Sequence, residues 1–548
     1  MKQIMEKPPP NFMPTGKTEV EPRKPSRRGF FKKSAGYAGG VAAGSVAPSF
    51  LSTEAAAAPQ QNEDARIMDR LERTNTDPRR RILLKAGAIV SMDAKVGNLA
   101  RADVLIDGQK ILGIGPDLST AAREGKAVVV DARDTIVMPG FCDPHIHAWE
   151  GQIARIIPNS NVIANDAQHN YFTVVHQILG PHYRPEDMYV GNLLTALSCI
   201  DAGITSFCDN SHNSRSSAHA DSAIRALFDS GVRAVYAGGP IRYTEEQTWD
   251  RQWPEDLRRI KRQYFSTDDQ LVTLRMLFAG ALDPDPSPRL PGPSRSGTKT
   301  LSVARDLDLW VSWDGGAANP QLPELYKNGL LAGKESYNHG TGVPEANWQL
   351  IREHGAKVNV CPRSDSQFTY GGTGKGYNGL QDALDHGVRP GISNDNASAY
   401  AIDMFLEMQV LYYTQRSLAQ LARFNRETKP PAAISARDVL EFATIRGAEC
   451  CALDAKCGSL TPGKEADIVL LRTGNIRQFP VNNAIAAIVQ AGVGDVDTVF
   501  IAGQAKKWRG RMTGKLAGQD FGKLRQRADD SRQYLFAKAG WPLDIFAD

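Results

Sequence analysis

Between residues 139 and 457, short apolar runs alternate with helical stretches. Eight of the runs read as strands, at 140–145, 205–209, 233–237, 271–278, 309–312, 335–338, 357–360 and 388–392. The helical stretches between them include 185–201, 218–230, 344–353, 379–386 and 402–420. Such alternation predicts a parallel sheet with crossover helices. Eight strands indicate a TIM-type (β/α)8 barrel, so the predicted fold class is α/β.

Further strand-like runs lie on both sides of this region. Residues 81–91, 102–115 and 127–138 precede it, and residues 467–472 and 497–508 follow it. Each set is too small to form a comfortable core alone. We therefore expect one small flanking β-sandwich domain formed by both chain ends. The expected units are the sandwich (81–138 and 458–515), the barrel (139–457) and an exposed helical tail (516–548).

The first 58 residues have the character of an export signal. They hold nine basic and four acidic residues, a net charge of +5, which leaves −1 for the rest of a chain whose total is +4. Residues 26–32 (SRRGFFK) resemble a twin-arginine signal, and a weakly apolar stretch and four alanines at 55–58 follow. We expect a signal peptide over 1–58, a linker over 59–80, the twin-arginine translocase as export partner, and a periplasmic or secreted bacterial protein.

Composition and short motifs argue against several other classes of protein. The nearly neutral body lacks the basic footprint of a nucleic-acid binder. Seven cysteines occur without any CxxC pair, which predicts buried free thiols and neither a disulfide framework nor a structural zinc cluster. Beyond the first 60 residues, no apolar run is long enough to span a bilayer.

The strongest chemical signal is the run PGFCDPHIH at 139–147. His145 and His147, at i and i+2, project to the same side of an extended strand end, so both imidazoles can reach one metal ion. Gly140 permits a close backbone approach where the strand enters the barrel. A lone HxH pair is a weak signal, and the Pro-Gly-Phe-x-Asp before it makes the signal strong.

These residues resemble the amidohydrolase superfamily, in its branch of triazine hydrolases and cytosine-deaminase-like aminohydrolases. Similar blocks stand at 201–205 (DAGIT), 337–340 (YNHG), 392–396 (ISNDN), 443–448 (ATIRGA) and 458–467 (GSLTPGKEAD). The resemblance runs from about residue 82 to 515. It implies the same barrel with a β-sandwich from both ends, and one divalent metal ion, zinc first, with iron and manganese as alternatives.

The resemblance also implies a role for each matching residue. His145 and His147 would be metal ligands. Asp395 would bind the metal and take a proton from the bound water, and His339 would polarise the substrate or stabilise the developing oxyanion. The chemistry is consistent, because a divalent metal with an open position makes hydroxide available near neutral pH. All four residues stand at C-terminal strand ends, where barrel chemistry is found.

The chain departs from the family at the fifth strand. The family normally has a third histidine there, but residues 309–316 read LWVSWDGG and no histidine lies between His219 and His339. The best alignment places Asp314 in the histidine's position, and a shift by one residue would place Trp313 there. The acid often found a few residues later is also missing. Three outcomes stay open: Asp314 replaces the ligand, the other three ligands bind the metal alone, or metal and catalysis are lost.

Four residues near the expected mouth of the barrel are candidates for substrate binding. Asp209 and His212 follow the second strand, although an Asx-type turn is an equal alternative. Trp149 follows the HxH pair. Trp313 would stack on a planar ring or fill the void left by the lost imidazole.

The expected function is metal-dependent hydrolysis of a non-peptide C–N bond in a small nitrogen-containing substrate. Deamination of a cyclic amidine, such as an aminated triazine, purine or pyrimidine, comes first, and hydrolysis of an amide, carbamate or urea comes second. The alternative is a catalytically impaired barrel that binds a ligand, because the fifth-strand histidine is absent. The family also indicates a homodimer, and no nucleic-acid partner is expected.

Overall fold

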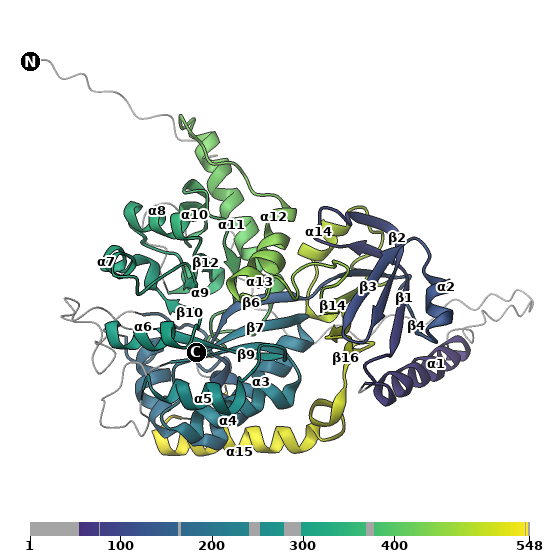
Figure 1. Cartoon of the computed structure of the whole chain (residues 1–548), viewed down its shortest axis with the longest axis horizontal. Coiled ribbons are helices and arrows are strands. Elements are labelled where there is room, and N and C mark those ends of the chain that lie inside the picture. The colour runs from purple at the N-terminus through teal and green to yellow at the C-terminus, as the bar shows by residue number, and fades with distance from the viewer. Residues whose placement is uncertain are drawn as a thin grey trace, which may run out of the picture. The chain divides into compact units, whose positions relative to one another are not determined.

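A computed structural model describes residues 54–75, 77–162, 166–239, 253–278, 297–368, 378–542 and 544–545 (Figure 1). Residues 60–548 form one compact unit. The twin-arginine-like segment 26–32 lies outside the described residues. Within the described ranges, no helix combines the length and apolar character that crossing a membrane requires.

Eight parallel strands among the described residues form one sheet, in chain order from β6 to β13. They are β6 (Phe141–Ile146), β7 (Ile204–Ser211), β8 (Arg233–Gly238), β9 (Val272–Phe278), β10 (Val311–Asp314), β11 (Glu335–Asn338), β12 (Lys357–Val360) and β13 (Gly391–Ile392). The ends of the sheet meet, because Asp395 N donates to His145 O at 2.9 Å and His147 N donates to Asp395 O at 2.8 Å. The sheet is therefore a nearly closed barrel, which confirms the predicted fold.

Helices cover the outside of this barrel (Figure 1). They include α3 (Pro185–Asp201), α4 (Ser217–Ser230), α5 (Asp256–Tyr264), α6 (Gly297–Asp306), α7 (Leu322–Lys327), α8 (Glu345–His354), α10 (Leu380–Asp385) and α11 (Met404–Phe424). The short helix α9 (Pro362–Gln367) instead follows β12 at the carboxyl ends of the strands. Local chemistry sets their ends. The Ser216 side chain caps α4 by accepting from His219 N, and α4 stops at Gly231, which adopts a left-handed φ of 68°.

The base of the barrel is closed by a short helical segment and by thiols. The segment comprises α12 (Ala436–Glu441), the π-helical turn η7 (Phe442–Arg446) and α13 (Gly447–Cys450). Cys142, Cys208, Cys451 and Cys457 pack there in one apolar cluster. All seven cysteines are buried and free, as the sequence predicted.

Strands from both chain ends form a second sheet. Its order is β17-β16-β15-β14-β5-β1-β2-β3, and β4 pairs with β1. The strands are β1 (Arg81–Val90), β2 (Asn98–Asp107), β3 (Lys110–Gly115), β4 (Val128–Asp131), β5 (Thr135–Pro139), β14 (Ile468–Arg472), β15 (Val496–Ile501), β16 (Gln504–Trp508) and β17 (Arg511–Met512). The antiparallel pairing of β14 with β5 joins the two ends, as expected. Each of the two chain parts that supply this sheet also contains a short helix. These helices are α2 (Ser119–Glu124) in the N-terminal part and α14 (Ala484–Val489) in the C-terminal part.

Two segments, one before and one after the two sheets in the sequence, differ from expectation. Helix α1 (Glu54–Arg73) enters the expected linker 59–80, where Leu71 is buried in the core of the flanking sheet and Ile67 packs against it. These apolar side chains lie one helical turn apart, so they share one face of the helix. Most other residues of the segment are polar, and its composition therefore predicted a linker. Helix α15 (Phe521–Ala539) is not an exposed tail, because Leu535 is buried and Ser531 donates to Asp187 Oδ1 at 2.7 Å.

Candidate metal centre

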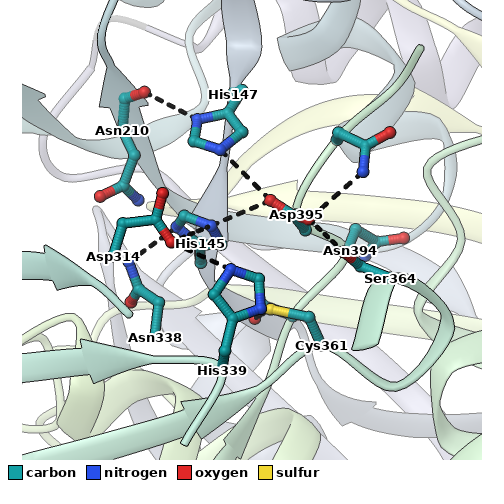
Figure 2. A network of polar contacts seen from close by, with 12 residues as sticks. His145, His147, Asn210, Asp314, Asn338, His339, Cys361, Ser364, Asn394 and Asp395 are labelled. Carbon is teal, nitrogen blue, oxygen red and sulfur yellow. Dashed lines mark hydrogen bonds and ion pairs between the residues drawn. The ribbon is translucent and has the colours of Figure 1, made fainter. Parts of the chain in front are cut away.

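Side chains from four barrel strands converge at the carboxyl ends of those strands (Figure 2). The Nε2 atoms of His145 and His147 lie 3.0 Å and 3.2 Å from Oδ1 of Asp395. Oδ1 of Asp314 lies 3.7 Å from Nε2 of His145 and 2.9 Å from Nε2 of His339. The structure thus brings together all five residues that the sequence singled out for metal binding and catalysis.

The backbone positions part of this cluster. Asp395 and His339 adopt positive φ angles of 69° and 72°, which are uncommon for residues other than glycine. The buried Asp143 accepts from His145 N at 3.1 Å and from Asn394 N and Nδ2 at 3.0 and 2.7 Å. This carboxyl group therefore clamps β6 to the segment after β13, and its burial raises the pKa of Asp143 to about 8.

The two histidines of the HxH pair are also held by contacts of their Nδ1 atoms, on the side of the ring away from Asp395. Nδ1 of His147 lies 2.9 Å from the backbone oxygen of Asn210. Because a carbonyl oxygen only accepts, Nδ1 carries a proton, and Nε2 faces Asp395. Burial would lower the pKa of His147, but the hydrogen bond and charge of Asp395 raise it to about 9 in the metal-free protein. Nδ1 of His145 lies 2.8 Å from the side-chain amide of Asn338. A histidine that binds a metal donates its second ring N–H as His147 does, whereas Nδ1 of His145 accepts from the Asn338 amide.

The donor set fits a divalent metal ion. Potential ligand atoms of His145, His147 and Asp314 all lie within 4.8 Å of one another. Nε2 of His145 and Nε2 of His147 both face Oδ1 of Asp395, at 3.0 and 3.2 Å, and all three side chains are buried. A cation between these atoms satisfies all of them, and mixed imidazole and carboxylate ligands suit zinc and also iron or manganese.

Asp395 is poised as a carboxylate. Burial alone would raise its pKa, but the hydrogen bonds and charges of His145 and His147 hold the pKa of Asp395 well below its usual range. The hydroxyl of Ser364 donates to Oδ2 of Asp395, which leaves Oδ1 toward the histidines. The carboxylate is therefore ionised and oriented before any substrate binds.

His339 lies between two carboxylates. Its Nδ1 is 2.7 Å from Oδ1 of Asp365, opposite the contact of Nε2 with Asp314. Burial would lower the pKa of His339, but the neighbouring Cys361, Asp365 and Asp314 together raise it well above its usual value. In the metal-free protein His339 is thus an imidazolium with a proton on each nitrogen.

Two of the four candidates for substrate binding lie beside this centre. Nε1 of Trp149 donates to Nδ1 of His212 at 3.2 Å, and Nε2 of His212 is 3.3 Å from Nε2 of His147. Asp209 instead accepts from Ala148 N at 3.1 Å and supports the turn after the HxH pair. Burial raises the pKa of Asp209 to about 7.

Trp313 does not face the centre. Its ring packs between strands and helices, with its centroid 4.6 Å from that of Phe278. The alternation of side chains along β10 explains this placement. Ser312 points into the barrel, where its hydroxyl donates to Asn210 Oδ1 at 2.6 Å, so Trp313 points out and Asp314 points in again.

The sequence did not single out Ser364 and Asp365, which the structure places against Asp395 and His339. Both lie on α9, which follows β12 directly and has Pro362 in its first turn. A helix that starts at the carboxyl end of a barrel strand places its first residues next to the site. This position in the sequence could have indicated both residues. Residues 371–376, a glycine-rich run in the sequence, lie outside the described residues.

The profile described as the amidohydrolase family matches residues 321–506. A 5'-deoxyadenosine deaminase of Methanosarcina mazei is 25% identical over 445 residues, which cover 77% of this chain and 92% of that protein. A 5-methylthioadenosine/S-adenosylhomocysteine deaminase of Pyrococcus horikoshii is 23% identical over 433 residues, which cover 77% and 94%.

Several solved structures share the fold. A zinc-bound adenosine deaminase from Xanthomonas campestris has a TM-score of 0.67 at 20% identity, over 83% of this chain and 98% of that one. An atrazine chlorohydrolase mutant from Arthrobacter aurescens, complexed with zinc and atraton, has a TM-score of 0.66 at 20% identity, over 82% and 100%. The chain is an enzyme, a hydrolase acting on carbon–nitrogen bonds other than peptide bonds. No finding supports the alternative of an impaired binding protein.

Proposed function

We propose that this chain is a metal-dependent deaminase of an aminated nitrogen heterocycle, a purine nucleoside first and an aminotriazine second. The observation that carries the proposal is the convergence of His145, His147, Asp314, Asp395 and His339 at the carboxyl ends of the barrel strands. The names of the similar proteins, which include adenosine-type deaminases, support the choice of substrate class.

Four residues would hold the metal: His145, His147, Asp395 and, in place of the missing histidine, Asp314. A divalent ion bound there would act as a Lewis acid and make hydroxide available near neutral pH. We favour zinc, because two similar structures contain it. Iron and manganese are the alternatives, and the carboxylate of Asp314 shifts the preference toward the harder metal.

The remaining chemistry belongs to the side chains. The ionised Asp395 accepts a proton from the attacking water and passes it to the departing amine. His339 donates a hydrogen bond from Nε2 to the atom of the substrate on which negative charge develops. Asp365, on the opposite ring nitrogen, keeps that imidazole charged and oriented. In balance, the water oxygen bonds to the ring carbon, the exocyclic C–N bond breaks, and ammonia leaves.

The test is a screen for ammonia release by the zinc-loaded chain. The panel holds adenosine, 5'-deoxyadenosine, 5'-methylthioadenosine, cytosine and an aminotriazine, followed by amides and carbamates. We expect ammonia from at least one ring amine and its loss in Asp395→Asn. Hydrolysis of an amide or carbamate without ring deamination would replace the proposal by the second reaction. Bound zinc with no turnover of either class would contradict it.

We also propose that residues 26–32 direct export by the twin-arginine route to the periplasm or beyond. The support is the run SRRGFFK followed by a weakly apolar stretch and four alanines. Replacing Arg27 and Arg28 by Lys should trap the precursor in the cytoplasm of a twin-arginine-competent host. A matched control replaces Lys2 and Lys7 by Arg and should leave export unchanged. Export that is the same in both would contradict the proposal.

A further inference from the structure

A buried arginine points into the barrel near its closed base. Arg275 stands on β9, beside Ala237 of β8 and two residues before Leu277. Ala237 and Leu277 belong to the apolar cluster that also contains the thiols at the base. Alternate residues of a strand face the same side of a sheet, so the side chain of Arg275 faces this interior as well. Arg275 is only 1% exposed.

The guanidinium of Arg275 has no partner for its charge within the part of the chain that the structure describes. Its three nitrogens, Nε, Nη1 and Nη2, make no hydrogen bond there, and no ion pair there includes Arg275. Its Cζ atom lies 5.3 Å from the centroid of the Trp310 ring, and a ring face attracts a cation without neutralising it. Arginine does not lose its proton in proteins, and an uncompensated buried charge is strongly destabilising. The position of Arg275 therefore calls for a counter-ion.

Neighbouring thiols do not supply the negative charge. Burial raises the pKa of Cys208 to about 12 and that of Cys450 to about 11, and the charge of Arg275 offsets only part of this effect. Both groups are therefore neutral thiols near pH 7. The thiol of Cys450 is also engaged, because it donates to Val358 O at 3.3 Å. Among the described residues, the counter-ion of Arg275 is thus neither a carboxylate nor a thiolate.

A second hydrogen-bond donor faces the same interior. Ser336 on β11 pairs with Ser312 on β10, whose hydroxyl points into the barrel. Residues in register on neighbouring strands face the same side of a sheet, so Ser336 points inward too. Its buried Oγ makes no hydrogen bond with any described residue. The barrel interior thus offers an anion both a guanidinium and a hydroxyl.

The surroundings of Arg275 select the kind of anion. One negative charge neutralises one guanidinium, whereas a sulfate dianion would leave a net negative charge buried. The apolar and thiol side chains there replace few of the water contacts of an ion, which favours an anion that loses its water at low cost. Chloride and bromide meet both conditions. Fluoride, the smallest halide, holds its water most tightly.

A positively charged cavity lies at the same end of the barrel. Its volume is about 400 Å³, and its lining includes four basic side chains, one acid and one thiol: Arg352, Lys357, Arg389, Arg446, Glu449 and Cys450. Arg389 and Arg446 pair with nearby acids, and Arg352 and Lys357 keep the lining positive. Cys450 links the cavity to the arginine, because it lines the cavity and its pKa responds to the charge of Arg275. A basic lining raises the local concentration of anions.

We propose that Arg275 forms a binding site for a small monovalent anion of the halide class, chloride first, at the base of the barrel. The bound ion accepts hydrogen bonds from the guanidinium and neutralises its buried charge. The site stabilises the folded barrel and takes no part in the reaction at the metal centre. The proposal is therefore independent of the proposed deamination.

The first arm of the test measures the Tm of the full chain in sodium chloride and in sodium gluconate at equal ionic strength. Gluconate is too large for an enclosed site. We expect chloride to raise the Tm by about 2–4 °C over gluconate, with a logarithmic dependence on its concentration above saturation. Bromide should act like chloride, and fluoride should have little effect. No rise specific to chloride or bromide in the parent would overturn the proposal.

Variants assign the effect to Arg275. Arg275→Met replaces the buried charge by an apolar side chain, so its Tm in gluconate should match or exceed that of the parent and should show no extra rise in chloride. Arg275→Lys keeps the charge and should keep a smaller rise. Arg437→Met, at an exposed position of α12, is the matched control and should respond as the parent does. The same chloride rise in Arg275→Met as in the parent would overturn the proposal.

The second arm locates the ion by anomalous scattering from crystals of the full chain soaked in sodium bromide. We expect a bromide peak within hydrogen-bond distance of the Arg275 guanidinium. Peaks at exposed arginines alone would be adventitious ions only and would overturn the proposal. This arm needs no variant, so it holds even if Arg275→Met does not fold. Neither arm measures turnover, so a failure of the proposed deamination leaves both results unaffected.

Discussion

The metal centre has two halves that are held in different ways. His145, His147 and Asp395 stand on β6 and just after β13, where reciprocal backbone hydrogen bonds close the barrel. Asp314 and His339 stand on β10 and just after β11, and they meet through an ion pair between side chains. The chain keeps the family pattern in the first half and departs from it in the second. A ligand held by side chains can change type without rebuilding the barrel.

The second half also shows where lost groups are replaced. The turn after β10 contains Gly315 and Gly316, where the family often has an acid, and it supplies no carboxylate beyond Asp314. A carboxylate instead reaches His339 from the other side, from Asp365 on α9. The imidazole of His339 is therefore flanked by two acids, one from β10 and one from α9. The departure from the family pattern at the fifth strand thus changes which residues supply the negative charge around the imidazole of His339.

The largest expected effect tests the half held by the backbone. His145→Ala removes a buried ligand that no neighbour can replace, because the other atoms there are fixed by the closure of the barrel. We expect metal content to fall from about one ion per chain to near zero, with turnover lost, by elemental analysis of the purified protein. His354→Ala is the control for the loss of a histidine. Full metal content in His145→Ala would move the centre elsewhere.

The next effect tests the half held by side chains. Asp314→Ala should weaken zinc binding by about tenfold, because three ligands remain. Asp314→His should retain or strengthen it and should shift the pH optimum downward by about one unit. Two carboxylates around a divalent ion give a formally neutral centre, and one carboxylate leaves it positive, so hydroxide becomes available at lower pH. Unchanged metal content in Asp314→Ala would remove Asp314 from the ligand set.

A smaller effect isolates the second acid on His339. Burial would lower the pKa of His339, but the charge of Asp365 and hydrogen bonds to Asp314 and Asp365 raise it well above its usual value. Asp365→Asn keeps the shape but removes one charge, so the pKa of His339 falls and the imidazolium is lost at lower pH. We expect the alkaline limb of the kcat profile to move to lower pH, with kcat at pH 7 reduced about tenfold.

Zinc content should not change in Asp365→Asn, because Asp365 contacts His339 and not the proposed ligands. Asp454→Asn, at an exposed position, is the matched control. A pH profile that is identical to that of the parent would show that Asp365 does not set the charge of His339. A shift of the limb to higher pH would reverse the sign of the argument.

The two halves also differ in how far the sequence predicts them. The strands were placed within a few residues, because each short apolar run is bounded by polar or turn residues. His145 and His147 followed from a local spacing. Asp365 was missed because its partner His339 lies 26 residues away and becomes a neighbour only through the curvature of the barrel. Trp313 was assigned to the pocket because sequence alone does not fix which side chains of a four-residue strand point inward.

The smallest expected effect is a loss of stability at the start of β6, the strand that carries His145 and leads to His147. Gly140 precedes β6, and a Cβ there would lie 2.0 Å from Oγ1 and 2.2 Å from Cγ2 of Thr205. Gly140→Ala should therefore lower the free energy of unfolding by about 1–3 kcal/mol, measured by urea denaturation. Gly494→Ala, where nothing lies within 4 Å, should be nearly neutral.

The double variant Gly140→Ala with Thr205→Ala separates local crowding from a general effect on β6. Removal of the threonine hydroxyl and methyl clears both close contacts, so the two changes should couple and the pair should be more stable than the sum of the single effects implies. Additive losses would place the strain elsewhere. Zinc content should stay at about one ion per chain in the folded variants, because Gly140 sets the approach of β6 to β7 and touches no ligand. A loss of zinc at full stability would show that the histidines depend on this contact, and not on the closure through Asp395.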